Sequence, residues 1–241
     1  MAVPLLDLRA QHARIRESVV AAMMKVVDDQ AFILGAPVSA LEADVSALSR
    51  TKYAVGCASG TDALLLALKA LDVGPGDEVV TTPFTFFATA GTIHNVGARA
   101  VFVDIDPKTF NIRPDLAAAA VTKKTKAIIP VDLFGQIAPL EEIQRLAPGV
   151  PVIEDAAQSI GARRKIGGAW RMAGECATIG TFSFFPSKNL GGYGDGGMMV
   201  TQDQAIADRL MKLRVHGGAR AYYHDEVGFN SRLDALQAEI G

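Results

Sequence analysis

The stretch Tyr53-Ala-Val-Gly-Cys-Ala-Ser-Gly-Thr-Asp-Ala-Leu-Leu-Leu-Ala-Leu-Lys-Ala-Leu71 decides the fold class. Its first six residues, 53–58, form a short apolar run that is typical of a strand, and residues 61–71 repeat apolar side chains at helical spacing. Ser59 and Gly60 stand between the two patterns, where a helix cap is expected. The stretch therefore predicts a strand that leads through a tight turn directly into a helix.

The same alternation of strand and helix continues on both sides of this stretch. Strand patterns occupy residues 78–81, 100–103, 127–131, 152–154, 179–184 and 198–201, and helical patterns occupy 17–27, 41–48, 87–95, 114–121, 140–146 and 203–215. Such alternation favours an α/β fold with a mostly parallel sheet and helices on both faces. Ligands bind these sheets beyond the carboxyl ends of the strands, so the loops that follow the strands carry the candidate chemistry.

Composition excludes several classes of protein. The 241 residues are 49% hydrophobic, which is typical of a globular domain, and the net charge of −2 argues against a nucleic-acid partner. Neither a membrane span nor a secretory signal is visible. Cys57 and Cys176 are too few for a disulfide framework, and the histidines show no metal-binding spacing. We expect a cytoplasmic protein with no metal, membrane or nucleic-acid partner.

The turn Ala58-Ser-Gly-Thr-Asp-Ala-Leu64 is a candidate phosphate cradle. Glycine allows a ligand to approach the backbone, and the start of a helix offers unpaired N–H groups at the positive end of its dipole. Ser59 or Thr61 could equally be an ordinary cap of a helix that binds nothing.

Two further segments carry unusual polar residues after strands. Val152-Ile-Glu-Asp-Ala-Ala-Gln158 ends an apolar strand with two acids, and a buried carboxylate needs a partner such as a protonated heterocyclic nitrogen, unless Asp155 is only a cap. Such a partner would lower the pKa of Asp155. In Thr181-Phe-Ser-Phe-Phe-Pro-Ser-Lys-Asn-Leu-Gly-Gly-Tyr-Gly-Asp-Gly-Gly197, one lysine lies among aromatic residues and glycines. A lysine shielded from water is a nucleophile for carbonyl groups, whereas on a surface turn Lys188 would simply be solvated.

A phosphate cradle, an acid and a lysine together are what a pyridoxal 5'-phosphate enzyme requires. The chain also resembles the DegT/StrS family of nucleotide-sugar aminotransferases. The shared motifs include Phe32-Ile-Leu-Gly35, Ser59-Gly-Thr-Asp-Ala63, Gly74-Pro-Gly-Asp-Glu78, Phe182-Ser-Phe-Phe-Pro-Ser-Lys-Asn-Leu190 and Asn230-Ser-Arg-Leu-Asp-Ala-Leu-Gln237, and they begin at Pro4-Leu-Leu-Asp-Leu8. The resemblance implies the large domain of the aspartate-aminotransferase architecture, with a mostly parallel sheet of seven-stranded type.

The resemblance assigns three residues to the reacting end of the cofactor. Lys188 corresponds to the lysine that forms the Schiff base with the cofactor's aldehyde. Asp155 corresponds to the acid that pairs with the pyridine nitrogen, and Gln158 to the amide near the phenolic oxygen. Some relatives carry histidine in place of the lysine and are sugar dehydratases, so Lys188 favours transamination.

Five more residues are assigned to cofactor binding in the same way. Gly60 and Thr61 correspond to the phosphate-binding turn, and Ser183 to a hydroxyl that contacts the phosphate. Phe86 corresponds to the aromatic residue that stacks on the ring, although it could also be ordinary core packing. Asn230 corresponds to a residue that reaches the phosphate of a neighbouring subunit in a homodimer, or is a cap of its own helix.

The implied function is transfer of an amino group, from glutamate, to a keto-sugar linked to UDP or dTDP, in glycan or antibiotic-sugar biosynthesis. A sugar dehydratase on the same platform and a non-catalytic regulator that binds the cofactor or a nucleotide sugar are the alternatives. Family members are usually longer. We therefore expect residues 1–241 to be the cofactor-binding large domain with an N-terminal helical segment, and a C-terminal small domain to be absent from this chain.

Overall fold

The computed structural model describes residues 3–4, 6–218, 220 and 222–240 of the chain, so Leu5 of the Pro4–Leu8 motif lies outside the described residues. The strands are β1 (Tyr53–Cys57), β2 (Glu78–Thr81), β3 (Arg99–Phe102), β4 (Thr125–Ile128), β5 (Ile153–Asp155), β6 (Arg163–Ile166), β7 (Ala169–Met172), β8 (Ile179–Ser183) and β9 (Gly197–Thr201). The helices are α1 (Arg9–Asp29), α2 (Ala36–Ser49), α3 (Gly60–Ala70), α4 (Phe87–Asn95), α5 (Pro114–Ala119), α6 (Leu140–Leu146), α7 (Gln204–Leu213) and α8 (Ala235–Ile240), with a 3-10 turn, η1, at Leu133–Gly135.

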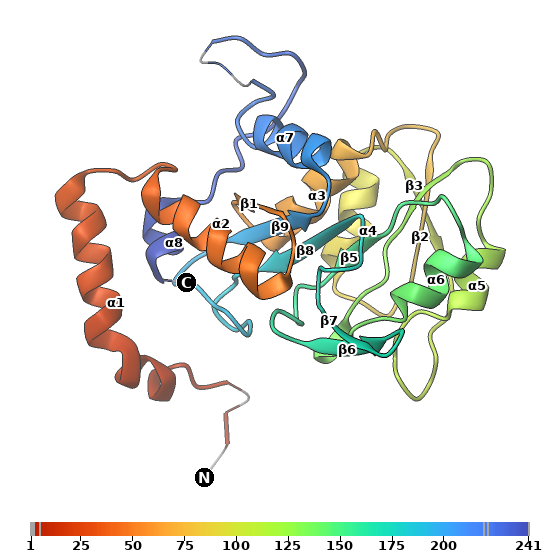
Figure 1. Cartoon of the computed structure of the whole chain (residues 1–241), viewed down its shortest axis with the longest axis horizontal. Helices are drawn as coiled ribbons and strands as arrows, with labels where there is room; N and C mark the ends of the chain where they lie inside the picture. Colours follow the sequence, from red (N-terminus) through yellow and green to blue (C-terminus); the bar gives the residue numbers. More distant parts are fainter. Residues whose placement is uncertain (1–2, 5, 219, 221, 241) are drawn as a thin grey trace.

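Apart from the β6–β7 hairpin, the strands form a mixed parallel and antiparallel arrangement at the centre of the molecule (Figure 1). One sheet has the order β1-β9-β8-β5 and a second has the order β3-β2-β4. Parallel bridges from Ile128 to Val152 and from Val131 to Asp155 connect β4 and the residues after it to β5. Strand β9 pairs antiparallel with both β1 and β8, while β5 pairs parallel with β8 and β2 pairs parallel with β3 and β4. The predicted α/β class is thus confirmed.

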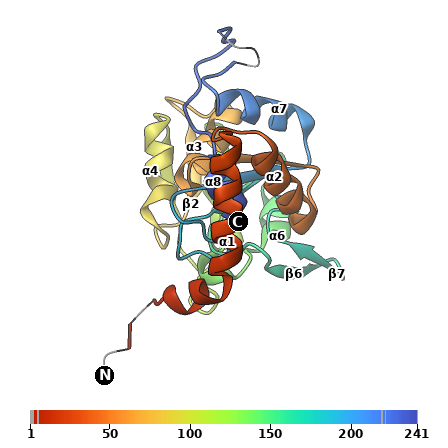
Figure 2. The ribbon, with the colours of Figure 1, turned by 90° about the vertical axis from the view of Figure 1, so that its left-hand side faces the viewer.

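Helices cover both faces of the strands because successive strand residues point to opposite sides. In β9, Met199 packs in a cluster with α3, α4 and α7, whereas Met198 and Val200 pack in a second cluster with α2 and α8. In β2, Val79 belongs to the first cluster, and Val80 to a third cluster beneath α5 and α6. Figure 2 shows α3 and α4 on one side of the molecule and α6 on the other.

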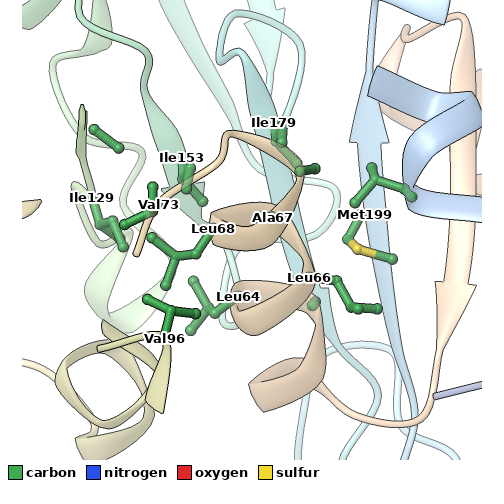
Figure 3. Close-up of a cluster of buried hydrophobic side chains, with 14 of the residues drawn as sticks. Leu64, Leu66, Ala67, Leu68, Val73, Val96, Ile129, Ile153, Ile179 and Met199 are labelled. Atoms are coloured by element: carbon green, nitrogen blue, oxygen red, sulfur yellow. The ribbon is translucent and has the colours of Figure 1, made fainter. Parts of the chain in front are cut away.

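Helix α3 is the central helix of the first cluster (Figure 3). Its residues Leu64, Leu66 and Leu68 are buried against strands from both sheets, including Ile153 of β5 and Ile179 of β8. The apolar run that follows Ser59 in the sequence therefore fixes α3 against the sheet. This packing also fixes the position of the helix N-terminus at the carboxyl end of β1.

Most of the predicted elements are present, with ends that shift by a few residues. The clearest difference from the sequence prediction is at residues 163–172. They form the β6–β7 hairpin, although the sequence predicts no strand there. Its alternate residues are exposed on the outside of the molecule, and Gly167 and Gly168 make its turn with positive φ angles of 56° and 86°. The hairpin has little apolar character, so the apolar pattern used for the other strands does not detect it.

Helix α1 has 21 residues and lies at one end of the molecule, where it packs on α8 (Figure 1). Only Val19 and Val26 of this helix are buried. None of the helices in the described part of the chain is both long and apolar enough to cross a membrane.

The core around α3 gives a direct test of the fold. We expect Leu68→Ala to lower the free energy of unfolding by about 2–5 kcal/mol, because Leu68 is 0% exposed and its loss leaves a cavity between helix and sheet. Leu48→Ala is the matched control, since Leu48 is a helical leucine that is 45% exposed. Urea unfolding monitored by circular dichroism measures both values. Equal losses for the two variants would contradict the packing of α3.

Candidate active site

A cavity of about 470 Å³ lies where β1, β2, β5 and β8 end. Seven of the eight site residues predicted from the sequence line it, namely Gly60, Thr61, Phe86, Asp155, Gln158, Ser183 and Lys188. These residues come from four separate loops, which meet because the carboxyl ends of parallel strands lie at the same edge of the sheet.

The N-terminus of α3 forms one wall of this cavity. The side chain of Ser59 caps the helix, because its Oγ accepts a hydrogen bond of 3.0 Å from the Asp62 N–H. The capping interpretation is therefore correct for Ser59. The next two residues, Gly60 and Thr61, line the cavity, and N–H groups in the first turn of a helix have no partner within the helix. They are available to an anionic group.

Gly60 lies against Ser183 at the end of β8. A Cβ atom added at Gly60 would come within 2.6 Å of the Ser183 Cβ and 2.9 Å of its Oγ. The Ser183 Oγ accepts a hydrogen bond of 3.3 Å from the Phe185 N–H. The hydroxyl and the helix N-terminus are thus brought together only because residue 60 has no side chain.

Asp155 ends β5 at the cavity and is only 6% exposed. Its Oδ2 accepts a hydrogen bond of 2.7 Å from the Thr89 hydroxyl of α4, and its Oδ1 accepts one of 3.3 Å from the Ala157 N–H. Burial raises the pKa of Asp155, although both hydrogen bonds and the positive charge of Lys188 oppose this effect. The lowered pKa expected from the sequence presupposes a cationic partner; within the chain alone the direction is upward.

Gln158 has its side-chain orientation fixed by the backbone. Its Oε1 accepts a hydrogen bond of 2.7 Å from the N–H of Phe134, which has a positive φ of 59°. Because the oxygen faces a backbone donor, the Nε2 amide group remains to donate a hydrogen bond to another acceptor. Gln158 lines the cavity and so can offer an N–H there.

Lys188 lies in the turn after β8 and lines the same cavity as Asp155. Its backbone N–H donates a hydrogen bond of 2.8 Å to the Phe185 carbonyl, which holds the turn. The side chain is partly buried, and its charge acts on the Asp155 carboxylate. Lys188 is thus partly shielded from water, and its role as a nucleophile stays a prediction.

Phe86 is at the rim of the cavity, between β2 and α4. It is 71% exposed, so the alternative of ordinary core packing is wrong for this residue. The neighbouring Thr85 hydroxyl shares a hydrogen bond of 2.8 Å with the Thr89 hydroxyl, which in turn donates to Asp155. This chain of hydroxyls connects the rim to the buried acid.

Asn230 is the one nominated residue that does not line the cavity of its own chain. It is exposed and forms an antiparallel bridge with Val215, ahead of α8. The adjacent Ser231 contacts the cradle, because its Oγ accepts a hydrogen bond of 3.3 Å from Ala58 N–H and donates one of 2.6 Å to Asp62.

Sequence reasoning missed two polar residues of the site. Asp132 lines the cavity and follows the predicted strand 127–131, so inspection of every loop after a strand would have found it. Thr89, in contrast, reaches Asp155 only because the fold brings the start of α4 to the end of β5, and no local pattern predicts a hydrogen bond between residues so distant in sequence.

Comparisons with known proteins identify similar chains. The family model described as the DegT/DnrJ/EryC1/StrS aminotransferase family matches residues 13–241. The pleiotropic regulatory protein of Geobacillus stearothermophilus is 54% identical, with 100% of this chain and 64% of the relative covered. The UDP-N-acetyl-3-dehydro-alpha-D-glucosamine 3-aminotransferase of Acidithiobacillus ferrooxidans is 51% identical, with 99% and 64% covered.

A solved structure is similar over the same region. The crystal structure of DesV from S. venezuelae in complex with a ketimine intermediate superposes with a TM-score of 0.94 at 40% identity, covering 99% of this chain and 64% of that protein. This chain spans 64% of the length of each of these three proteins.

The contact between Gly60 and Ser183 gives a second prediction. We expect Gly60→Ala to lower the free energy of unfolding by about 1–3 kcal/mol, because the new methyl group overlaps the Ser183 Cβ. Combining it with Ser183→Gly should recover part of that loss in a double-mutant cycle.

Gly91→Ala is the matched control for this cycle. Gly91 is also in a helix, but its added methyl would meet only the exposed ring of Phe87 at 3.0 Å. Chemical denaturation of the four variants and the parent measures the effects. A cost for Gly60→Ala no greater than that for Gly91→Ala would show that residue 60 has space for a side chain.

Proposed function

The chain belongs to the DegT/DnrJ/EryC1/StrS aminotransferase family, and we propose that its cavity binds pyridoxal 5'-phosphate and transfers an amino group to a keto-sugar carried on a nucleotide. One observation carries this proposal: Lys188, the buried carboxyl of Asp155 and the N-terminus of α3 line a single cavity of about 470 Å³. An amine, an acid and an anion site are the three groups that this cofactor requires of a protein.

The residues present fit the phosphate end of the cofactor. Gly60 and Thr61 would bind the phosphate through their backbone N–H groups at the positive end of the α3 dipole. The Ser183 hydroxyl, brought beside them by the missing side chain at Gly60, would add another hydrogen bond. No lysine or arginine is needed in this wall for an anion to bind.

The other end of the cavity fits a cationic ring nitrogen. Burial raises the pKa of Asp155, and a protonated pyridine nitrogen would supply the opposite charge that favours the ionised carboxylate. Thr89 and Ala157 N–H hold the carboxyl in place. Asp155 would thus keep the ring nitrogen protonated, which is its proposed part in catalysis.

The sides of the cavity would hold the ring between them. The Nε2 group of Gln158 is free to donate to the phenolic oxygen, since its Oε1 is occupied by the Phe134 N–H. Phe86, exposed at the rim, would stack on the ring and shield it from water.

When bound, the cofactor supplies an aldehyde that exchanges amines and a ring that delocalises the negative charge left on carbon after deprotonation. The Lys188 Nζ would hold the cofactor by bonding to its aldehyde carbon, with the oxygen leaving as water. When it is free, the same amine would act as the base that takes up a proton and the acid that returns it. Lys188 lines the cavity from a turn that its backbone hydrogen bond to Phe185 holds.

The proposed substrates follow from the family and from the relatives. The printed name of the Acidithiobacillus ferrooxidans relative gives a UDP-linked 3-keto sugar as its substrate, and we extend that chemical class to this chain as a UDP- or dTDP-linked keto-sugar. Glutamate is the proposed amino donor. The two free thiols, Cys57 and Cys176, are compatible with the reducing cytoplasm that we propose as its compartment.

We also propose that the site works in a homodimer. Asn230 is exposed and lies outside its own cavity, so its amide is available to a second copy of the chain. Its backbone is held close to the cradle by the hydrogen bonds of Ser231 to Ala58 and Asp62. A two-fold axis near the cradle would place Asn230 of each chain at the phosphate of the other.

The third prediction tests whether the Lys188 amine bonds to the cofactor and takes part in amino transfer. With pyridoxal 5'-phosphate added, borohydride reduction should attach the cofactor to Lys188, as peptide mass mapping would show. Lys188→Ala should lower amino transfer about 10²–10⁴-fold or more, because both nucleophile and proton carrier are lost. Lys165→Ala, which removes an exposed lysine of the β6–β7 hairpin, should change neither result.

The visible absorbance of the cofactor–protein mixture separates the candidate functions. A band that glutamate bleaches supports amino transfer. A band that no amino donor changes supports the regulator that only binds, and one that changes with a nucleotide sugar alone supports the dehydratase. Labelling of another lysine, or no band at all, would contradict the cofactor assignment.

The fourth prediction tests the homodimer. Lys188→Ala and Asn230→Ala subunits are each expected to be impaired, but their mixture should regain activity because half of the heterodimer sites contain both intact residues. Activity of the mixture is measured against each parent after subunit exchange. No recovery, or a cofactor-loaded protein that sediments as a monomer, would contradict the role of Asn230.

A further inference from the structure

Two buried carboxyl groups, one of which lines the cavity, are not used in the proposed reaction. Glu154 precedes Asp155 in β5 and is 0% exposed, and Asp132 follows β4 and is 1% exposed. Neither carboxyl lies within 4.0 Å of a lysine, arginine or histidine in the part of the chain that the structure describes. Two ionised carboxylates in such a place would repel each other without compensation.

The hydrogen bonds around the two groups favour Glu154 as the one that carries a proton. Asp132 accepts at both oxygens, from the Ala138 N–H at 2.8 Å and from the Ser159 hydroxyl at 2.7 Å. Glu154 Oε2 accepts a hydrogen bond of 2.9 Å from the Gly174 N–H. The other oxygen, Glu154 Oε1, is buried and has no hydrogen-bond partner among the described residues. The Asp132 carboxyl acts on Glu154, so a proton on Glu154 Oε1 that is donated to Asp132 would satisfy this remaining atom.

We propose that Glu154 and Asp132 share one proton across this carboxyl–carboxylate hydrogen bond, and that the pair is a positioning element that holds Asp155 and Gln158 at the cavity. The second half of this inference rests on the proposed function. The charged groups that act on the pair are Asp155 and the two carboxyls themselves, and none of the ion pairs of the described residues includes Glu154 or Asp132. Burial raises the pKa of Glu154 well above its ordinary value, which agrees with a proton held at neutral pH.

The pair acts on the site through the segments that it joins. Asp132 connects the loop that ends at Ala138 with Ser159, which is the residue after Gln158. The Asp132 N–H also donates a hydrogen bond of 3.0 Å to the Asp155 carbonyl. The backbone carbonyl of Glu154 is held as well, because it accepts a hydrogen bond of 3.0 Å from the Thr181 hydroxyl. Loss of the pair would therefore release the turn that carries Asp155 and Gln158.

The first experiment measures the shared proton without any cofactor. If Glu154 stays protonated in the folded chain but ionises on unfolding, folding becomes less favourable as the pH rises. The unfolding constant of the parent should thus rise relative to that of Glu154→Gln by up to about tenfold per pH unit between about pH 5 and 7. Glutamine reproduces both hydrogen bonds of the protonated acid and cannot ionise.

Glu175→Gln is the matched control for this experiment. Although burial acts to raise the pKa of Glu175, hydrogen bonds from Arg171 and the Met172 N–H lower it on balance. That carboxylate is ionised in both states across this pH range, so the ratio of unfolding constants should stay flat. A flat ratio for Glu154→Gln as well would overturn the shared proton.

Infrared spectroscopy is a second test of the shared proton, and it does not require Glu154→Gln to fold. At pH 7 the parent chain and Asp155→Asn should both show the C=O stretch of a protonated carboxyl group. Asp155→Asn removes the other buried acid of the cavity, so the band that remains belongs to the pair. Its absence would overturn the proposal.

The positioning role is tested by binding of pyridoxal 5'-phosphate. We expect Glu154→Ala to weaken the equilibrium affinity about five- to tenfold, and Glu154→Gln to restore it to within about twofold of the parent. Equally poor binding by both variants would overturn the positioning role. If the parent itself does not bind the cofactor, the proposed function and the positioning role fail together, while the unfolding experiment still decides whether the proton is shared.

Discussion

The burial of the Asp155 carboxyl at the end of β5 is the constraint around which the site is built. A carboxylate removed from water must be hydrogen-bonded or paired, and Thr89 of α4 and the Ala157 N–H provide only part of that compensation. Lys188 supplies a positive charge nearby, yet the pKa of Asp155 is still raised. A ligand with a cationic group at this point, such as the proposed cofactor, would supply the compensation that the chain leaves incomplete.

The scaffold makes that constraint tolerable because β5, which carries Asp155, is held on both sides. The β5 backbone at Asp155 bonds to the segment after β4 on one side, through Pro130 and Asp132, and β5 pairs with β8 on the other. Helix α3 is held by its buried leucines against β5 and β8, so its N-terminus stays at the cavity. The same packing that stabilises the core thus sets the spacing between Asp155 and this helix N-terminus.

The sequence predicts the fold and the site to different depths. The alternation of apolar runs predicts the strands and helices that build the sheet, and the rule that ligands bind beyond strand ends selects the loops of Gly60, Asp155 and Lys188. The antiparallel direction of β9 and the polar β6–β7 hairpin escape prediction because neither has a distinct local pattern. Thr89 and the Glu154–Asp132 contact depend on long-range packing, so they become visible only once the elements are assembled.

The central claim is that Asp155, Lys188 and the N-terminus of α3 form one cofactor site. A crystal structure of this chain grown with pyridoxal 5'-phosphate tests it most directly. We expect the phosphate at the Gly60 and Thr61 N–H groups, the ring nitrogen within hydrogen-bond distance of the Asp155 carboxylate, and continuous electron density from the cofactor to the Lys188 side chain. Electron density for the cofactor that is absent from this cavity, or that places the ring nitrogen away from Asp155, would contradict the account.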